Sequence, residues 1–178
     1  MRIVDVKHEL RDPNLAHAAC MRAGMLLVAS VAQNDTHFRV PDAHLLRRVS
    51  VGGATEWLFY TRQRRVSPRL CSVHVYSEAA ARSRFGVHGL RVQLAVRKRR
   101  TTWLWRGVRI NLDDVSSLGL FAEIESPVGV RTRVPGAAEA LRSVRDLLGP
   151  ALGEPVSLSY RDLMAREIAY DAYDAGAA

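Results

Sequence analysis

The sequence has no long apolar segment. No stretch approaches the roughly 20 consecutive apolar residues that a transmembrane helix needs, and the charged N-terminus, MRIVDVKHELRDP, lacks the apolar core of a signal peptide. Internal repeats, low-complexity tracts and dividing linkers are missing as well. We therefore expect one cytoplasmic domain without a membrane partner, spanning residues 1–170, with residues 171–178 as a frayed C-terminal tail.

Metal-binding motifs built from cysteine or histidine are also missing. The two cysteines, Cys20 and Cys71, lie far apart and show no CxxC spacing, so we expect two buried thiols rather than a zinc site. The six histidines show neither HExxH nor HxH spacing. A histidine-based metal centre is therefore not expected.

The composition is that of a folded domain with an excess of positive charge. The 178 residues are 48% hydrophobic and 25% charged, which excludes a disordered chain and allows a substantial core. Lysine and arginine number 26 against 18 aspartates and glutamates, for a formal charge of +8. This excess suggests an anionic partner such as a nucleotide, a polyphosphate or a nucleic acid, and charge alone does not choose among them.

Local patterns predict a mostly antiparallel sheet with several helices. Asp12 and Pro13 have the character of an N-cap and a first helical residue, and predict a helix that ends near Gly24. Further helices are predicted at 77–86, 135–149 and 159–170. Alternation and β-branched or aromatic residues predict strands at 2–10, 28–33, 36–40, 45–51, 55–62, 70–76, 90–100, 101–105, 109–115 and 120–125. The two segments at 90–100 and 101–105 are expected to form a hairpin.

Charged residues repeat at every second position in several predicted strands, so they share strand faces. These faces contain Asp5, Lys7 and Glu9; Lys98 and Arg100; Arg109, Asn111 and Asp113; and Glu123 and Glu125. In an ordinary sheet such faces turn to solvent. In a closed barrel wide enough for water they gather in the lumen, where carboxylates can hold a divalent cation and basic side chains can bind phosphate. The residues leave both interpretations open.

Motifs along nearly the whole chain resemble the CYTH superfamily, in its class IV adenylate cyclase-like branch, which is related to thiamine triphosphatases. VDVKHELRDP resembles the family's ExExK strand, QNDTHF its QxDxYF segment, LLRR the basic strand that follows, and EWLFYTR its LIxYxR strand. VRKRR resembles the VxKxR strand. RINLDDVSSLGLFAEIE and SYRDLM, which resemble the hLDxVxxLGxFxEIE core and the closing SYxDLL helix, are the most specific.

This resemblance implies an α+β fold: a single-domain antiparallel β-barrel, the triphosphate tunnel, with flanking helices. It implies a divalent metal, Mg²⁺ or Mn²⁺, at Asp5, Asp113, Glu123 and Glu125. It also implies that phosphate oxygens of a nucleoside triphosphate or other organic polyphosphate contact Lys7, Arg48, Arg62, Lys98, Arg100 and Arg109, with Lys7 and Arg100 catalytic.

Two motifs depart from the family pattern. The ExExK strand appears as Ile3, Asp5 and Lys7, which lacks the first carboxylate and shortens the second. In the strand that the family often writes RLKLR, His44 and Leu46 replace two of three expected positive charges. These changes predict weaker metal binding and a weaker hold on phosphate.

Three functions therefore stay open. The first is a metal-dependent enzyme that cyclises or hydrolyses a nucleoside triphosphate or related polyphosphate. The second is a degenerate tunnel that only binds nucleotide or polyphosphate. The third is a barrel recruited to another reaction on a phosphorylated or nucleoside intermediate, which His37 in place of tyrosine and the apolar substitutions favour. Strand tryptophans are more typical of cores than of base stacking, so nucleic acid is not expected as a partner. We expect a monomer or a homodimer.

Overall fold

The strands close into an eight-stranded antiparallel barrel. The computed structural model describes residues 1–62, 68–86, 89–130 and 132–176. The strands pair in the order β5-β4-β3-β2-β6-β7-β8-β1, and β1 pairs back onto β5. They span Arg2–Leu10 (β1), Leu26–Phe38 (β2), His44–Ser50 (β3), Glu56–Arg62 (β4), Arg69–Ser77 (β5), Val92–Trp105 (β6), Val108–Val115 (β7) and Gly119–Val128 (β8). The predicted barrel fold is confirmed.

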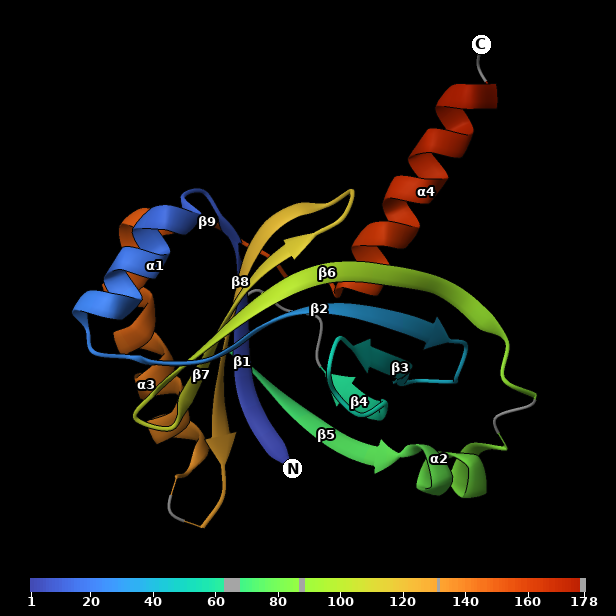
Figure 1. The fold of residues 1–178 in the computed structure, drawn as a ribbon, viewed down its shortest axis with the longest axis horizontal. Coiled ribbons are helices and arrows are strands. Elements are labelled where there is room, and N and C mark those ends of the chain that lie inside the picture. Colours follow the sequence, from blue (N-terminus) through green and yellow to red (C-terminus); the bar gives the residue numbers. More distant parts are fainter. Residues whose placement is uncertain (63–67, 87–88, 131, 177–178) are drawn as a thin grey trace.

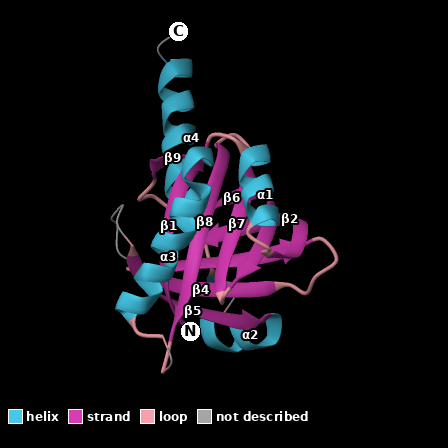
Figure 2. Ribbon diagram, turned by 90° about the vertical axis from the view of Figure 1, so that its left-hand side faces the viewer, coloured by secondary structure: helices cyan, strands magenta, loops and turns pink. Residues whose placement is uncertain are grey.

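Helices flank the outside of this barrel (Figures 1 and 2). They span Pro13–Arg22 (α1), Glu78–Phe85 (α2), Val134–Leu148 (α3) and Tyr160–Gly176 (α4). Helix α3 packs on β8, β1 and α1, whereas α2 packs on β5 and β4. Helix α4 begins at the barrel and then extends away from it. No described helix is both long and apolar enough to cross a membrane.

The main core lies between the barrel wall and its helices. Val4 and Val6 of β1 are almost fully buried in a cluster with apolar residues of β7, β8, α1 and α3. Asp5 and Lys7 alternate with them and line the interior of the barrel. Because successive side chains of a strand point to opposite faces, the same strands present an apolar outer surface and a charged inner one.

Local signals in the sequence account for the helix boundaries. The Asp12 side chain accepts a hydrogen bond from the Leu15 backbone amide at 2.9 Å, which caps α1 as predicted. Gly86 ends α2 with a φ of 58°, a left-handed conformation that glycine adopts at little cost. Helix α4 continues to Gly176, beyond its predicted end at Tyr170.

Two pairs of predicted strands are single long strands. Residues 28–33 and 36–38 belong to β2, and the expected hairpin of 90–100 and 101–105 is wrong because residues 92–105 form the single strand β6. No glycine, proline, asparagine or aspartate lies near the junction of Arg100 and Thr101, so nothing there favours a turn. The chain reverses instead at Arg106 and Gly107, whose φ values are 48° and 81°. The short strand β9 (Leu152–Pro155), which pairs with β1, was not predicted.

The packing of α3 yields a stability prediction. Leu141 is fully buried between α3 and the barrel, whereas Leu147 of the same helix is 42% exposed. Leu141→Ala should lower the free energy of unfolding by about 3 kcal/mol, because it leaves a cavity in the main core. Leu147→Ala, the matched control, should lower it by less than about 1 kcal/mol. Urea unfolding measures both, and equal losses would contradict this packing.

Candidate functional site

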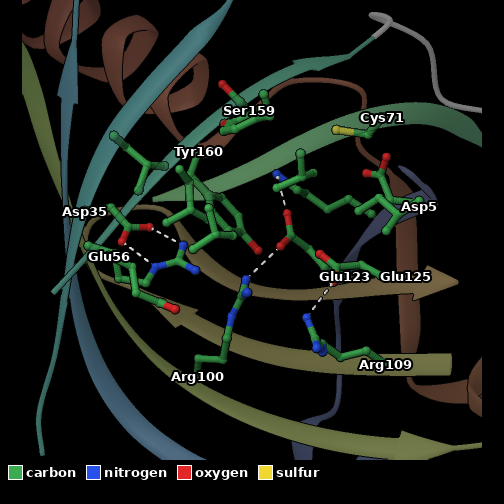
Figure 3. Close-up of a pocket in the computed structure, with 18 of the residues that line it drawn as sticks. Asp5, Asp35, Glu56, Cys71, Arg100, Arg109, Glu123, Glu125, Ser159 and Tyr160 are labelled. Carbon is green, nitrogen blue, oxygen red and sulfur yellow. Dashed lines mark hydrogen bonds and ion pairs between the residues drawn. The ribbon is translucent and has the colours of Figure 1, made fainter. Parts of the chain in front are cut away.

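The barrel encloses a cavity of about 350 Å³ to which all eight strands contribute side chains (Figure 3). Its charged lining is evenly balanced between basic and acidic groups. The basic residues are Lys7, Arg48, Lys98, Arg100 and Arg109, and the acidic ones are Asp5, Asp35, Glu56, Glu123 and Glu125. Charged strand faces that an open sheet would turn to solvent are thus gathered inside the barrel.

Glu123 of β8 links two basic residues of the cavity. Lys7, its direct cross-strand partner on β1, lies 3.2 Å from one carboxylate oxygen, and Arg100 of β6 lies 2.7 Å from the other (Figure 3). The Lys7 ammonium also donates to the Leu158 carbonyl at 3.1 Å and sits 3.6 Å from the centroid of the Tyr160 ring. These contacts hold the ammonium of a side chain that is only 1% exposed.

Asp113 of β7 is enclosed by donors. Arg100 donates to its two oxygens at 2.7 and 2.5 Å, and the Tyr160 hydroxyl donates at 2.8 Å. Burial opposes the charge of Arg100, but Asp113 and Glu123 outweigh it and raise the pKa of the guanidinium well above its usual value. Asp113 was predicted as a metal position, yet it is absent from the described lining of the cavity because its oxygens face Arg100 and Tyr160.

Asp35 of β2 forms a second paired cluster. Arg48 donates to both of its oxygens, at 2.8 and 2.7 Å, and Lys98 makes a close ion pair with the same carboxylate. Burial favours the neutral acid, but the two cations outweigh burial and lower the pKa of Asp35 below its usual range. Burial also lowers the pKa of Lys98, to about 8, against the attraction of Asp35.

A row of four cross-strand partners contains two further carboxylates of the cavity. Arg109, Glu125, Asp5 and Arg69 follow one another across β7, β8, β1 and β5. Arg69 donates to Asp5 at 2.8 Å and to the Ser157 carbonyl at 2.9 Å, whereas Arg109 lies 3.7 Å from Glu125. Burial and the neighbouring negative charges raise the pKa of Glu125 to about 7. At Glu125, burial and the acidic neighbours therefore outweigh the attraction of Arg100 and Arg109.

Most of the predicted site residues lie together. Eight of the ten predicted positions line the cavity. The other two are Asp113, which is enclosed behind the lining, and Arg62, which is in β4 but whose side chain lies outside the described residues. Asp35, Glu56, Arg69 and Tyr160 were not predicted as site residues. Asp35 lies in the motif QNDTHF and Tyr160 in the motif SYRDLM, so the family resemblance could have identified both as site residues.

The carboxylate oxygens of the cavity suit a hard cation that also binds phosphate oxygens of a substrate. Among the described residues no group of three or more histidine, cysteine, aspartate or glutamate side chains is arranged to hold a metal ion. Glu125 is nevertheless a partly buried carboxylate beside Glu123 and Asp5, and one Asp5 oxygen is buried without a hydrogen-bond partner in the described structure. Mg²⁺ commonly uses one or two carboxylates together with phosphate oxygens and water, and this arrangement fits that chemistry.

Glu125 yields a pH-dependent prediction for the metal-free protein. Its folded pKa of about 7 lies above the ordinary 4.5, so its contribution to stability is full below pH 4.5 and is lost as pH rises through 7. Glu125→Gln should therefore become more stable than wild type across this range, by up to about 3 kcal/mol. Urea unfolding from pH 4.5 to 8 tests this, with the exposed Glu154→Gln as control. A difference that does not change with pH would contradict it.

Solved structures with similar folds cover most of this chain. A conserved hypothetical protein from Pyrococcus furiosus superimposes with a TM-score of 0.72 at 18% identity, covering 90% of this chain and 99% of its own. A candidate adenylate cyclase from Vibrio parahaemolyticus gives 0.71 at 15% identity, covering 92% and 97%. A candidate adenylyl cyclase from Hippeastrum, described as having a dominant triphosphatase activity, gives 0.60 at 13% identity, covering 94% and 96%.

Sequence comparison identifies the family independently of the fold. A search of curated proteins finds no significant match. The model of the CYTH domain, however, matches residues 4–155, which include β2 to β8 and all but the first two residues of β1. The match therefore covers the elements that build the cavity. The chain belongs to the CYTH domain family.

Proposed function

We propose that the protein is a divalent-metal-dependent phosphotransfer enzyme that acts on a nucleoside triphosphate or a related organic polyphosphate. The observation that carries this proposal is the cavity inside the barrel, whose lining combines five basic side chains with five carboxylates. Membership of the CYTH family and the cyclase and triphosphatase descriptions of two similar structures support it. An acyl-transfer or redox function has no comparable support from this lining.

The balance of charge inside the cavity explains why a metal would be needed. Each of Lys7, Arg48, Lys98 and Arg100 already faces a carboxylate, so the cavity has little net charge with which to attract a polyanion. Glu123 and Glu125, with Asp5 beside them, are the groups that would hold Mg²⁺ or Mn²⁺. A bound divalent cation would supply positive charge for the phosphate oxygens and polarise the reacting phosphoryl group.

Lys7 and Arg100 would bind the phosphate chain. Both residues form ion pairs with Glu123 in this structure, so a phosphate must compete with that carboxylate for their N–H donors. Arg100 keeps its second partner, Asp113, and that pair fixes the orientation of its guanidinium. Lys98 of β6 and Arg48 of β3, both held by Asp35 of β2, would add further positive charge. Such preorganised donors stabilise negative charge as it develops in the transition state.

Two reactions are compatible with this geometry. In a cyclase the 3′-hydroxyl of the nucleotide attacks the α-phosphorus and pyrophosphate leaves, giving a cyclic nucleotide. In a triphosphatase water attacks the terminal phosphorus and orthophosphate leaves with the remaining diphosphate. Both need positioned phosphates and differ in which nucleophile is in line. The Hippeastrum protein, which was named for one activity and is described with the other, supports testing both in the same assay.

The first functional prediction concerns turnover. With Mn²⁺ or Mg²⁺ present, the purified protein should convert at least one of ATP, GTP, thiamine triphosphate and inorganic tripolyphosphate. Chromatography should show pyrophosphate and a cyclic nucleotide for a cyclase, or orthophosphate for a triphosphatase. Chelation of the metal should abolish the reaction, because the cavity alone is nearly neutral. If calorimetry detects binding without turnover, the protein is a binding module and the proposed enzyme is wrong.

The second functional prediction concerns the phosphate-binding residues. Lys7→Met and Arg100→Met should each lower kcat/KM by about 100-fold or more, because each removes a cation that neutralises phosphate charge. Arg11→Met is the matched control, since Arg11 pairs with Glu154 on the exposed surface. Circular dichroism should show that the folds are retained. Unchanged kinetics in a Lys7→Met, Arg100→Met double variant would place the reaction elsewhere.

A further inference from the structure

One side of the cavity is apolar rather than charged. Leu46 of β3, Leu58 of β4 and Val75 of β5 are direct cross-strand neighbours and all line the cavity. Tyr60 and Val73 form the adjacent cross-strand pair on β4 and β5. We call these five residues, Leu46, Leu58, Tyr60, Val73 and Val75, the apolar wall. Cross-strand partners have Cβ atoms about 5 Å apart, so the wall is a continuous surface.

The apolar wall and the charged wall belong to different parts of the barrel. In the ring of strands, β3, β4 and β5 are separated from β6, β7 and β8 by β2 on one side and by β1 on the other. Among the described residues of β3, β4 and β5 that line the cavity, only Arg48 and Glu56 are charged, and they are cross-strand partners at one end of the apolar wall. The phosphates of a ligand would therefore find donors mainly on β1, β6 and β7.

Phosphate oxygens gain nothing from the apolar wall. Hydrocarbon cannot replace the hydrogen bonds that each oxygen makes with water, so placing phosphate there costs desolvation energy without compensation. An apolar or aromatic group has the opposite preference, because contact with the wall removes its surface from water. Val75 is 54% exposed where it lines the cavity, so a group on the wall can extend toward solvent.

His37 provides a polar group beside the wall. It is the cross-strand partner of Leu46, it lines the cavity, and it is only 3% exposed. Within the described residues its Nδ1 atom has no hydrogen-bond partner. Burial lowers the pKa of His37 to about 4, so the ring is neutral near pH 7. A neutral ring nitrogen can make a hydrogen bond to a heteroatom of an organic ligand without adding charge.

We propose that the apolar wall and His37 bind the organic part of the substrate, so that the cavity selects a polyphosphate carrying an apolar or aromatic group over inorganic polyphosphate. The proposal rests on the proposed function, because it assigns the phosphates of the same ligand to the charged wall. The cavity would then have two chemically distinct halves. Leu46 determines specificity most directly, because it lies between His37 and Leu58 in the cross-strand row.

Calorimetry with two probes tests this assignment. The probes are ATP and inorganic tripolyphosphate. Each is added with Ca²⁺ in place of Mg²⁺, because the flexible coordination of Ca²⁺ should allow binding while slowing conversion of the probe. Wild type should bind ATP at least about tenfold more tightly than tripolyphosphate, a discrimination typical of apolar contacts. Binding of ATP should also show the more negative heat-capacity change, which reports burial of apolar surface.

Substitutions in the wall should change the preference. Leu46→Arg should weaken ATP binding, strengthen tripolyphosphate binding and abolish the tenfold preference. Because Leu46 is only 4% exposed, the more exposed Val75→Lys is a second variant that should change the ratio in the same direction. Val49→Lys is the matched control, since Val49 is 41% exposed and does not line this cavity. It should leave the ratio unchanged.

The possible results separate the two proposals. If wild type binds tripolyphosphate as tightly as ATP, or if folded Leu46→Arg and Val75→Lys keep the wild-type ratio, the assignment of the wall is wrong while the proposed function stands. If wild type binds neither probe, the assignment of the wall is wrong, and turnover of GTP or thiamine triphosphate decides the proposed function. A preference for ATP that both wall variants reduce, and that Val49→Lys retains, supports both.

Discussion

The structure depends on mutual neutralisation of charged side chains inside a closed barrel. Isolated charges of this kind would be costly to remove from water. Glu123 neutralises Lys7 and Arg100 together, and Asp35 does the same for Arg48 and Lys98. Breaking one partner of such a pair leaves the other buried without compensation, which makes these clusters far more sensitive than surface ion pairs. Closure of the barrel and pairing of its interior charges therefore require each other.

Because the interior of the barrel is polar, the hydrophobic core that stabilises the fold lies on the outside of the barrel. Small barrels often fill their lumen with apolar side chains. Here Val4, Val6 and Ile110 point outward and are covered by helices, as are Leu45 and Trp57 on the other side. The Trp57 indole donates to Glu78 of α2 at 2.7 Å, so the buried ring is satisfied. The helices thus keep the barrel folded and leave its interior to bind ligand.

Two residues that depart from the family pattern, Leu46 and Ile3, both line the cavity, so they can affect which ligand it binds. Leu46 occupies a strand position for which the family motif predicts a positive charge, and it lies in the apolar wall beside His37. Ile3 replaces a carboxylate and also lines the cavity. Loss of the positive charge at Leu46 reduces the surface suited to phosphate, and loss of the carboxylate at Ile3 removes a possible metal ligand. Both changes increase the apolar surface of the cavity, so they are consistent with one altered specificity.

The sequence by itself determined which side chains share a strand face, where α1 and α2 begin and end, and to which family the motifs belong. These features follow from local rules: a period of two in strands, capping residues, and short motifs. Only the tertiary structure decided that Arg48 and Lys98 meet on Asp35, that Asp113 is enclosed by Arg100 and Tyr160, and that an apolar wall faces the charged one. Those contacts depend on which strands are neighbours and on closure of β1 against β5, and strand periodicity carries no information about either.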